Sequence, residues 1–343
     1  MNWQSRISDP LHFPLKVALA VSRQGWVTKK TFPSFLVGVG NLTLGGSGKT
    51  PCVAWLAQHF SQKSKKVFIV SRGYRRKAKG LTVVKPDDTA QRVGDEPLWL
   101  AHVVPGVKVI VGDKIQAIEY ASKREAAETV IVDDAFQRRW QVQFDVHIIL
   151  VREVDSLIQG SPHPAGWVRE GWGQIGDATI IGLHADAMSV KGLEALDRVA
   201  PSVPIFTWRL APVAWYEVGG GSQSLLEARR RSMPLESVRG KKVYALAGIG
   251  HPERFLKTLA SIGAEVVGHH MVADHHWYTA SELDHVVEKA HALGARWVVT
   301  TEKDAVRLIG WMRPMKVPVA VMAVSFMVES GGTVLNKTLG LGS

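Results

Sequence analysis

The stretch FLVGVGNLTLGGSGKTP, residues 35–51, joins a short apolar segment to a glycine-rich loop that ends in Gly48, Lys49 and Thr50. In a phosphate-binding loop of the form G-x-x-x-x-G-K-[ST], backbone N–H groups at a helix N-terminus face the phosphates. The lysine adds a positive charge and the hydroxyl reaches Mg²⁺. Thr43 stands where that pattern has its first glycine, which changes the loop's entrance but not its phosphate-facing end. The stretch therefore predicts a strand at 35–40, a helix from near Pro51 and, between them, a nucleoside triphosphate site built from Thr43, Leu44, Gly45, Gly46, Ser47, Gly48, Lys49 and Thr50.

Short apolar segments alternate with helix-compatible segments after this loop. The apolar ones are KVFIVS, KVIVGD, TVIVDD, DVHIILV and ATIIGL, and DEPLWLAHVV and KIQAIEYASKREA lie between them. Such alternation is typical of a mainly parallel sheet with helices on both faces. We therefore predict an α/β fold of the P-loop NTPase type.

A second, smaller α/β unit follows a break rich in glycine, serine and arginine, EVGGGSQSLLEARRRSMPLESVRGKK. It opens with KKVYALAGIG and ends with the apolar segment PVAVMAVSFMV. A chain of 343 residues is long enough for two domains. The predicted division is an N-terminal segment at 1–34, a phosphate-loop domain at 35–220, a linker at 221–240, a C-terminal α/β domain at 241–330 and a loose tail at 331–343.

Paired carboxylates follow or begin two of the predicted elements. Asp133 and Asp134 end the apolar segment TVIVDD, where a group that organises Mg²⁺ belongs in this class of fold. Asp95 and Glu96 begin the helix-compatible segment DEPLWLAHVV. Carboxylates are also stabilised at a helix N-terminus by its positive dipole end, so a structural role and a chemical role are both open for this second pair.

A run of Asp274, His275 and His276 lies in the second unit. Two adjacent histidines without further ligands do not make a metal site, and the chain has no HExxH or cysteine-based zinc pattern. A lone histidine is commonly structural.

Composition limits the classes of partner. The excess of 42 basic over 31 acidic residues gives a net charge of +11, which suits anionic lipid, phosphorylated substrates or nucleic acid. Because the basic residues are dispersed and no motif interleaves them with aromatic residues, we expect no nucleic-acid partner. The single cysteine, Cys52, excludes an internal disulfide framework.

The N-terminal segment includes the run LHFPLKVALAVSRQGWV, residues 11–27. Its charged residues interrupt the roughly 20 apolar residues that a membrane-spanning helix needs, and no signal-peptide pattern is present. Its apolar residues can share one face of a helix, with the lysines and arginines elsewhere. Such a helix fits a membrane interface or the surface of the chain's own domain.

Taken in order, the motifs resemble those of the tetraacyldisaccharide 4′-kinase family, the lipid A 4′-kinases of Gram-negative bacteria. The resemblance is carried between residues 36 and 308 by VGNLTLGGSGKTP, SRGY, VGDEP, DDAFQ, PAGWVRE, AGIGHPERF, ADHH and TEKDAVRL. The family's own phosphate loop has threonine at the position of Thr43. The resemblance implies an enzyme that uses ATP and Mg²⁺ to phosphorylate the 4′-hydroxyl of an acylated disaccharide lipid, tetraacyldisaccharide 1-phosphate. The product would be lipid IVA, an intermediate of lipid A and lipopolysaccharide biosynthesis.

The resemblance also implies a peripheral protein on the cytoplasmic face of the bacterial inner membrane, which favours the interfacial reading of the N-terminal segment. Asp95 would be the catalytic base, oriented by His275, and Lys49 would act on the phosphates of ATP. Residues near Mg²⁺ would be Thr50, Glu96, Asp133 and Asp134, and a loop with Ser71, Arg72 and Tyr74 would meet the lipid head group. Since Asp95 and His275 belong to different predicted domains, we expect the site to be completed when the domains close.

Two positions depart from the family pattern Asp-Asp-Gly-x-Gln-His, because this chain has Ala135 and Arg138. Alanine lacks the freedom of glycine at positive φ. Arginine cannot act as a base, although it can bind an anionic acceptor. Two alternatives therefore stay open: a kinase for another phosphosugar or lipid acceptor, and an ATP-driven switch or partition ATPase that forms no phosphorylated lipid.

Overall fold

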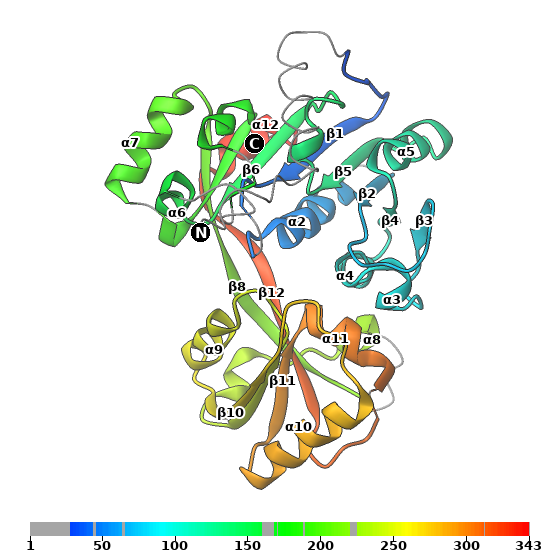
Figure 1. Cartoon of the computed structure of the whole chain (residues 1–343), viewed down its shortest axis with the longest axis vertical. Coiled ribbons are helices and arrows are strands. Elements are labelled where there is room, and N and C mark those ends of the chain that lie inside the picture. The colour runs from blue at the N-terminus through cyan, green and yellow to red at the C-terminus, as the bar shows by residue number, and fades with distance from the viewer. Residues whose placement is uncertain are drawn as a thin grey trace, which may run out of the picture.

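The computed structural model describes residues 28–43, 46–63, 66–159, 168–169, 171–187, 189–219, 225–311 and 313–342. Leu44, Gly45 and most of the predicted segment 1–34 lie outside these ranges. Two bodies lie one above the other, joined by the long strands β8 (Ile205–Val218) and β12 (Val319–Ser330) (Figure 1). Within the described ranges, no helix has the length and apolar character needed to cross a membrane.

Twelve strands of the described residues form one sheet, in the order β10-β9-β11-β12-β8-β7-β6-β1-β5-β2-β4-β3. Neighbouring strands are parallel except for the pairs β3–β4 and β8–β12. The predicted mainly parallel α/β fold is therefore confirmed. The other strands are β1 (Phe35–Gly40), β2 (Val67–Ser71), β3 (Thr82–Val84), β4 (Lys108–Val111), β5 (Thr129–Asp133), β6 (Val146–Val151), β7 (Ile180–His184), β9 (Lys242–Ala247), β10 (Glu265–Met271) and β11 (Trp297–Thr301).

Helices cover both faces of the sheet, as alternate side chains of β5 show. Ile131 packs in the cluster that contains Leu56 of α2, whereas Val130 and Val132 pack in the cluster that contains Ile118 of α5. Strand residues alternate between faces, so α2 and α5 lie on opposite sides of the sheet. The helices are α2 (Lys49–Ser61), α3 (Ala90–Val93), α4 (Asp95–Val103), α5 (Lys114–Glu119), α6 (Val154–Gln159), α7 (Val190–Val199), α8 (Leu225–Arg230), α9 (Pro252–Ser261), α10 (Ala280–Ala292), α11 (Glu302–Leu308) and α12 (Gly332–Thr338).

The second body extends the same sheet as the first. Strands β8 and β12 pair along most of their length, and both run from one body into the other. The sequence analysis identifies no strand over β8. Pro212 lies inside this strand and is accommodated where the register with β12 shifts, because a proline cannot donate to a regular ladder.

The C-terminal residues form a helix where the sequence analysis expects a loose tail. Helix α12 follows Gly331 and packs against β8, with Leu335 buried. Gly331 has a φ of 72°, and a Cβ at this position would lie 2.7 Å from the carbonyl oxygen of Ile205. The chain therefore returns from the C-terminal body to the N-terminal body through a turn that only glycine fits.

We expect Gly331→Ala to destabilise the chain more than Gly340→Ala. Both glycines have positive φ, so each alanine costs about 1–2 kcal/mol of backbone strain. At Gly340 a Cβ would meet nothing within 4 Å, whereas at Gly331 it would also press on Ile205 and add about 1–3 kcal/mol. Urea denaturation midpoints measure the difference, and equal midpoints for the two variants would contradict this account of the turn.

Candidate active site

The phosphate-binding loop lies between β1 and α2, in the predicted strand–loop–helix context. Gly48 has a φ of 79° and precedes the first turn of α2. A Cβ on Gly48 would lie 2.5 Å from Cη2 of Trp208, a fully buried residue of β8. The helix start therefore rests on the strand that joins the two bodies, and only glycine fits there.

Thr43 and Lys49 are both held by Asn41, which follows β1. The Asn41 amide donates to the carbonyl oxygen of Thr43 at 2.6 Å, and Asn41 Oδ1 accepts from Lys49 Nζ at 2.8 Å. Lys49 Nζ also donates to Ser47 Oγ at 3.1 Å and lies 3.5 Å from Asp134 Oδ1. A hydrogen bond from Asn41 therefore fixes the backbone of Thr43 at the loop's entrance, and the Lys49 ammonium lies near the Asp134 carboxylate.

Asp134, directly after β5, is surrounded by cations. Arg169 Nη1 lies 2.8 Å from Asp134 Oδ1, and Lys114 donates to the Asp134 carbonyl oxygen. Burial acts to raise the pKa of Asp134, but Lys49, Lys114 and Arg169 outweigh it and lower the pKa below its usual value. Asp134 is therefore ionised, and it also adopts a φ of 51°.

Asp133, the last residue of β5, is buried, and the nearby Lys49 and Lys114 do not outweigh the effect of burial on its pKa. Among the described residues its Oδ1 has no hydrogen-bond partner. Burial, with the nearby carboxylates of Glu96 and Asp134, raises the pKa of Asp133 to about 7. Among the described residues, no three side chains of His, Cys, Asp or Glu are grouped so that they could hold a metal ion by themselves. The one local observation that points to a cation is the unsatisfied Asp133 oxygen, because carboxylate oxygens are ligands that Mg²⁺ prefers. Thr50 lies in the first turn of α2.

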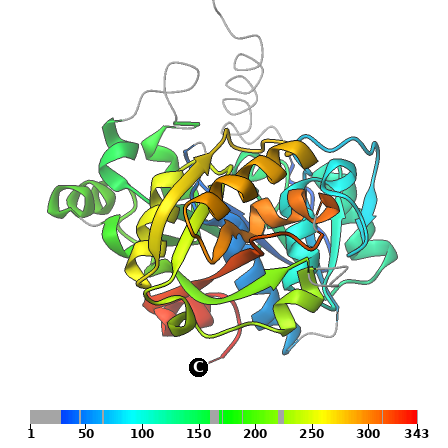
Figure 2. The same cartoon turned by 90° about the horizontal axis from the view of Figure 1, so that it is seen from below.

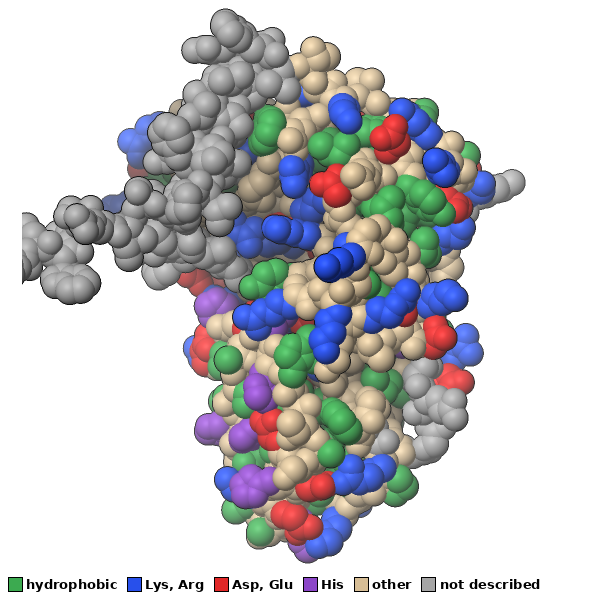
Figure 3. Space-filling view, turned by 45° about the vertical axis from the view of Figure 1, so that its right-hand side comes forward, with side chains coloured by type: hydrophobic (Ala, Val, Ile, Leu, Met, Phe, Trp, Pro, Cys, Tyr) green, Lys and Arg blue, Asp and Glu red, His purple; other side chains and the backbone are tan. Residues whose placement is uncertain are grey.

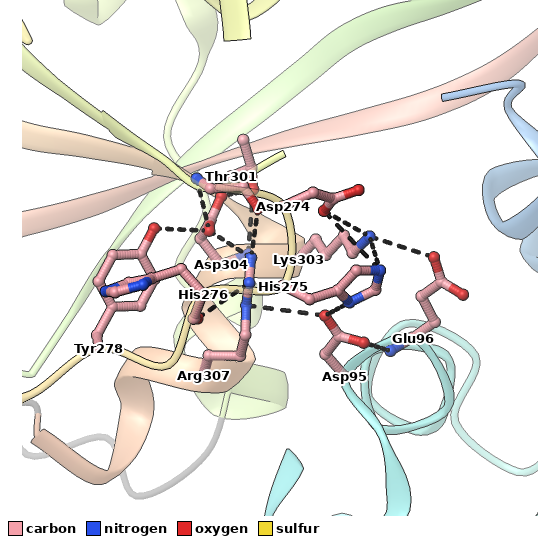
Figure 4. A network of polar contacts seen from close by, with 11 residues as sticks. Asp95, Glu96, Asp274, His275, His276, Tyr278, Thr301, Lys303, Asp304 and Arg307 are labelled. Carbon is pink, nitrogen blue, oxygen red and sulfur yellow. Dashed lines mark hydrogen bonds and ion pairs between the residues drawn. The ribbon is translucent and has the colours of Figure 1, made fainter. Parts of the chain in front are cut away.

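Asp95 and His275 meet across the two bodies. Seen from below, the orange α11 lies beside the cyan segment that holds α3 and α4, and α11 packs against α4 (Figure 2). At this contact His275 Nδ1 lies 2.8 Å from Oδ2 of Asp95, the first residue of α4 (Figure 4). Burial acts to raise the pKa of Asp95, but His275, Lys303 and Arg307 together lower it. Asp95 is thus a buried, ionised carboxylate that a histidine from the other body contacts.

The loop after β2 lies next to this pair. Ser71 ends β2 and is buried, and its carbonyl oxygen accepts from the Gly112 N–H at 3.2 Å. Arg72 and Tyr74 are exposed, and the Tyr74 ring centroid lies 5.2 Å from that of His275. An exposed aromatic ring therefore borders the acid–histidine pair.

A family model described as tetraacyldisaccharide-1-P 4′-kinase, LpxK, matches residues 11–339. The chain belongs to this 4′-kinase family. A tetraacyldisaccharide 4′-kinase of Anaeromyxobacter dehalogenans strain 2CP-C is 38% identical over 283 residues, 80% of this chain and 72% of the relative. One of Chromobacterium violaceum is 32% identical over 90% of this chain and 85% of the relative. Among solved structures, LpxK of Aquifex aeolicus, crystallised with ATP, superposes with a TM-score of 0.72 at 25% identity, over 96% of this chain and 94% of that one.

Several 4′-kinase motif residues at the site carry no role in the sequence analysis. Lys303, Asp304 and Arg307, from the motif TEKDAVRL, lie on α11 beside Asp95 and His275 (Figure 4). Arg169, from the motif PAGWVRE, contacts Asp134. These four residues belong to motifs that carry the family resemblance, so the sequence could have indicated a role for them at the site. Lys114 is in none of these motifs, and no pattern in the sequence points to it.

The two departures from the 4′-kinase pattern are accommodated locally. Ala135 has a φ of −85°, and the positive φ falls on Asp134 instead, so the turn does not require glycine at residue 135. The Ala135 side chain is buried, and its N–H donates to the Val39 carbonyl oxygen at 2.8 Å. Arg138 donates to Gln141 at 2.6 Å. The strain expected from alanine is therefore absent.

We expect Asp133→Asn to stabilise the metal-free chain at pH 8 but not at pH 5. A carboxyl with a folded pKa of about 7 and an unfolded pKa near 4 binds its proton more tightly in the folded state. Its favourable contribution is complete below about pH 4 and is lost as the pH rises through about 7. Asparagine avoids the buried charge, so the gain at pH 8 is on the order of 1 kcal/mol or more.

Urea unfolding of both proteins in the presence of EDTA measures this gain. The pH 5 comparison serves as the control, because Asp133 carries its proton there. An equal difference in unfolding free energy at both pH values would contradict the assignment of a raised pKa to Asp133.

Proposed function

We propose that this chain transfers the γ-phosphoryl group of ATP to the 4′-hydroxyl of tetraacyldisaccharide 1-phosphate, giving lipid IVA in lipid A biosynthesis. One observation carries the proposal: the 2.8 Å contact between Asp95 and His275 lies beside a phosphate-binding loop and its carboxylates. A switch ATPase needs the loop alone. A base held by a histidine from the other body is what a hydroxyl acceptor needs.

The nucleotide end of the site neutralises phosphate charge. The backbone N–H groups at the start of α2 and the Lys49 ammonium would bind the phosphates of ATP, as in other phosphate loops. Thr50, Glu96, Asp133 and Asp134 would hold Mg²⁺. Bound there, Mg²⁺ would neutralise charge on the phosphates and on the buried Asp133 carboxyl.

The acceptor end supplies a proton acceptor. Asp95 accepts the proton of the 4′-hydroxyl while the hydroxyl oxygen forms a bond to the γ-phosphorus of ATP. The bond between that phosphorus and the β–γ bridging oxygen breaks, and ADP is released. His275 holds Oδ2 of Asp95, and the Glu96 N–H donates to Oδ1 at 3.0 Å, so both carboxylate oxygens are fixed in place. A carboxylate oxygen has more than one lone pair, so Asp95 can still accept a proton from the sugar. The low pKa of Asp95 keeps it ionised, so it is ready to accept a proton at neutral pH.

The acylated acceptor would approach along the loop of Ser71, Arg72 and Tyr74. Lys and Arg side chains gather near the junction of the two bodies on the face shown in Figure 3. With the net charge of +11, they suit a phosphorylated lipid and an anionic membrane surface. We include in the proposal a peripheral place on the cytoplasmic face of the inner membrane, with residues 1–34 as the interfacial segment.

Incubation of the purified full chain with Mg²⁺, ATP and the disaccharide 1-phosphate tests the proposal directly. Mass spectrometry is expected to find one added phosphate on the lipid, with ADP formed in equal amount. ADP without a phosphorylated lipid would overturn the proposal in favour of a switch ATPase. Phosphorylation of other phosphosugar lipids but not of this one would indicate a kinase for a different acceptor.

We expect Asp95→Asn to lower kcat by about 10²-fold or more, because an amide cannot accept the hydroxyl proton. ATP affinity, measured by calorimetry, is expected to stay largely unchanged, since Asp95 contacts His275 and not the phosphate loop. Asp284→Asn is the matched control, because Asp284 is an exposed carboxylate of α10 that pairs with Arg313. A turnover of Asp95→Asn close to that of Asp284→Asn would show that Asp95 is not the base.

A further inference from the structure

Lys303 lies at the centre of the contact between the two bodies and has no part in the chemistry described so far. It is in the first turn of α11, and 24% of its side chain is exposed. Its Nζ lies 3.3 Å from Glu96 Oε1, 3.3 Å from Asp274 Oδ1 and 3.4 Å from His275 Nε2 (Figure 4). One ammonium group therefore touches a residue of α4, the loop after β10 and the ring of the proposed catalytic histidine.

The contact with His275 fixes the direction of two hydrogen bonds. A lysine ammonium has three donors and no acceptor, so His275 Nε2 must be the acceptor in this contact. A neutral imidazole with a bare Nε2 carries its proton on Nδ1. That N–H points at Asp95 Oδ2, 2.8 Å away. The two hydrogen bonds therefore have the same direction: Lys303 donates to His275, and His275 donates to Asp95.

Carboxylates surround the Lys303 ammonium. Those of Glu96 and Asp274 each lie 3.3 Å from Nζ. His275 itself faces Asp95, Asp274 and Lys303, and the Tyr74 ring covers one side.

We propose that Lys303 is a positioning residue that holds His275 in the Nδ1–H tautomer and thereby orients the Asp95 carboxylate. The opposite tautomer would turn a lone pair of Nδ1 toward a carboxylate oxygen, and the contact between the two bodies would lose its hydrogen bond. The inference rests on the proposed function only where it calls Asp95 the base. The tautomer itself is a property of the ligand-free chain.

A second fixed cation supports this arrangement. The Arg307 side chain is fully buried, and its Nε lies 3.8 Å from Asp95 Oδ2 without a hydrogen-bond partner among the described residues. It is held by Asp304 and by the carbonyl oxygens of Gly248 and His276. Arg307 attracts Asp95 but makes no contact with Nε2 of His275, so it cannot select the tautomer. Lys303 is the cation that contacts Nε2, and it favours the same tautomer as the Asp95 carboxylate at Nδ1.

Nitrogen-15 NMR of the full chain labelled at histidine, without nucleotide, reads the tautomer directly. The His275 signal is assigned by its loss in His275→Asn. In the wild type we expect a protonated Nδ1 and a bare Nε2. In Lys303→Met a measurable fraction of Nε2 is expected to become protonated, whereas Lys303→Arg, which keeps a cation with N–H donors only, retains the wild-type pattern. Lys316→Met, which removes an exposed lysine paired with Glu288, is the control and leaves the spectrum unchanged.

Kinetic measurements distinguish a positioning role of Lys303 from a role that only stabilises the contact between the two bodies. For Lys303→Met we expect kcat to fall about tenfold or more, with KM for ATP within about twofold of the wild type and partial rescue in Lys303→Arg. A wild type with the proton on Nε2, or a Lys303→Met variant with an unchanged spectrum, overturns the inference. If Lys303→Met does not fold, Lys303→Gln, which also removes the charge, takes its place. Absence of lipid phosphorylation by the wild type would refute the proposed function but leave the tautomer result standing.

Discussion

The bond between Asp95 and His275 is the interaction on which the rest of the site depends, because it is where the two bodies of the chain meet. A carboxylate as buried as Asp95 is costly unless cations and hydrogen bonds compensate it. Here the compensation comes from the other body: His275, Lys303 and Arg307 all face Asp95 from the segment after β10 or from α11. The same groups that compensate the buried charge of Asp95 also join the two bodies, because the Asp95–His275 contact forms where α4 packs against α11.

Near the phosphate-binding loop, cations compensate one carboxyl group but not the next. Asp134 has more than enough positive partners, whereas Asp133 is buried with an oxygen that no described group satisfies. An unsatisfied buried carboxyl weakens the ligand-free fold, and proteins keep such groups where a ligand supplies the missing charge. The unsatisfied oxygen of Asp133 is therefore the observation behind the proposal that Mg²⁺ binds beside it.

Much of the fold follows from local patterns. The strand at 35–40 appears with the predicted bounds, because a short apolar run before a glycine loop has few alternatives. Strand β8 escaped prediction, since Pro212 and a mixture of polar and apolar residues hide its periodicity. Its length is set by pairing with β12, which lies about a hundred residues later in the chain and which no local pattern reveals. The helix after Gly331 was missed for the same reason, because its stability comes from packing on β8.

The sequence by itself determined the chemical inventory of the site: a phosphate loop ending in Lys49, acidic residues at two element ends, and a histidine in the second unit. It could also attach roles to Asp95 and His275 through the family resemblance. Only the tertiary structure decided that these two residues touch and that Lys303 lies on the far side of the ring. The physical reason is that residue type sets what a group can donate or accept, whereas its partner is chosen by the packing of elements distant in the chain.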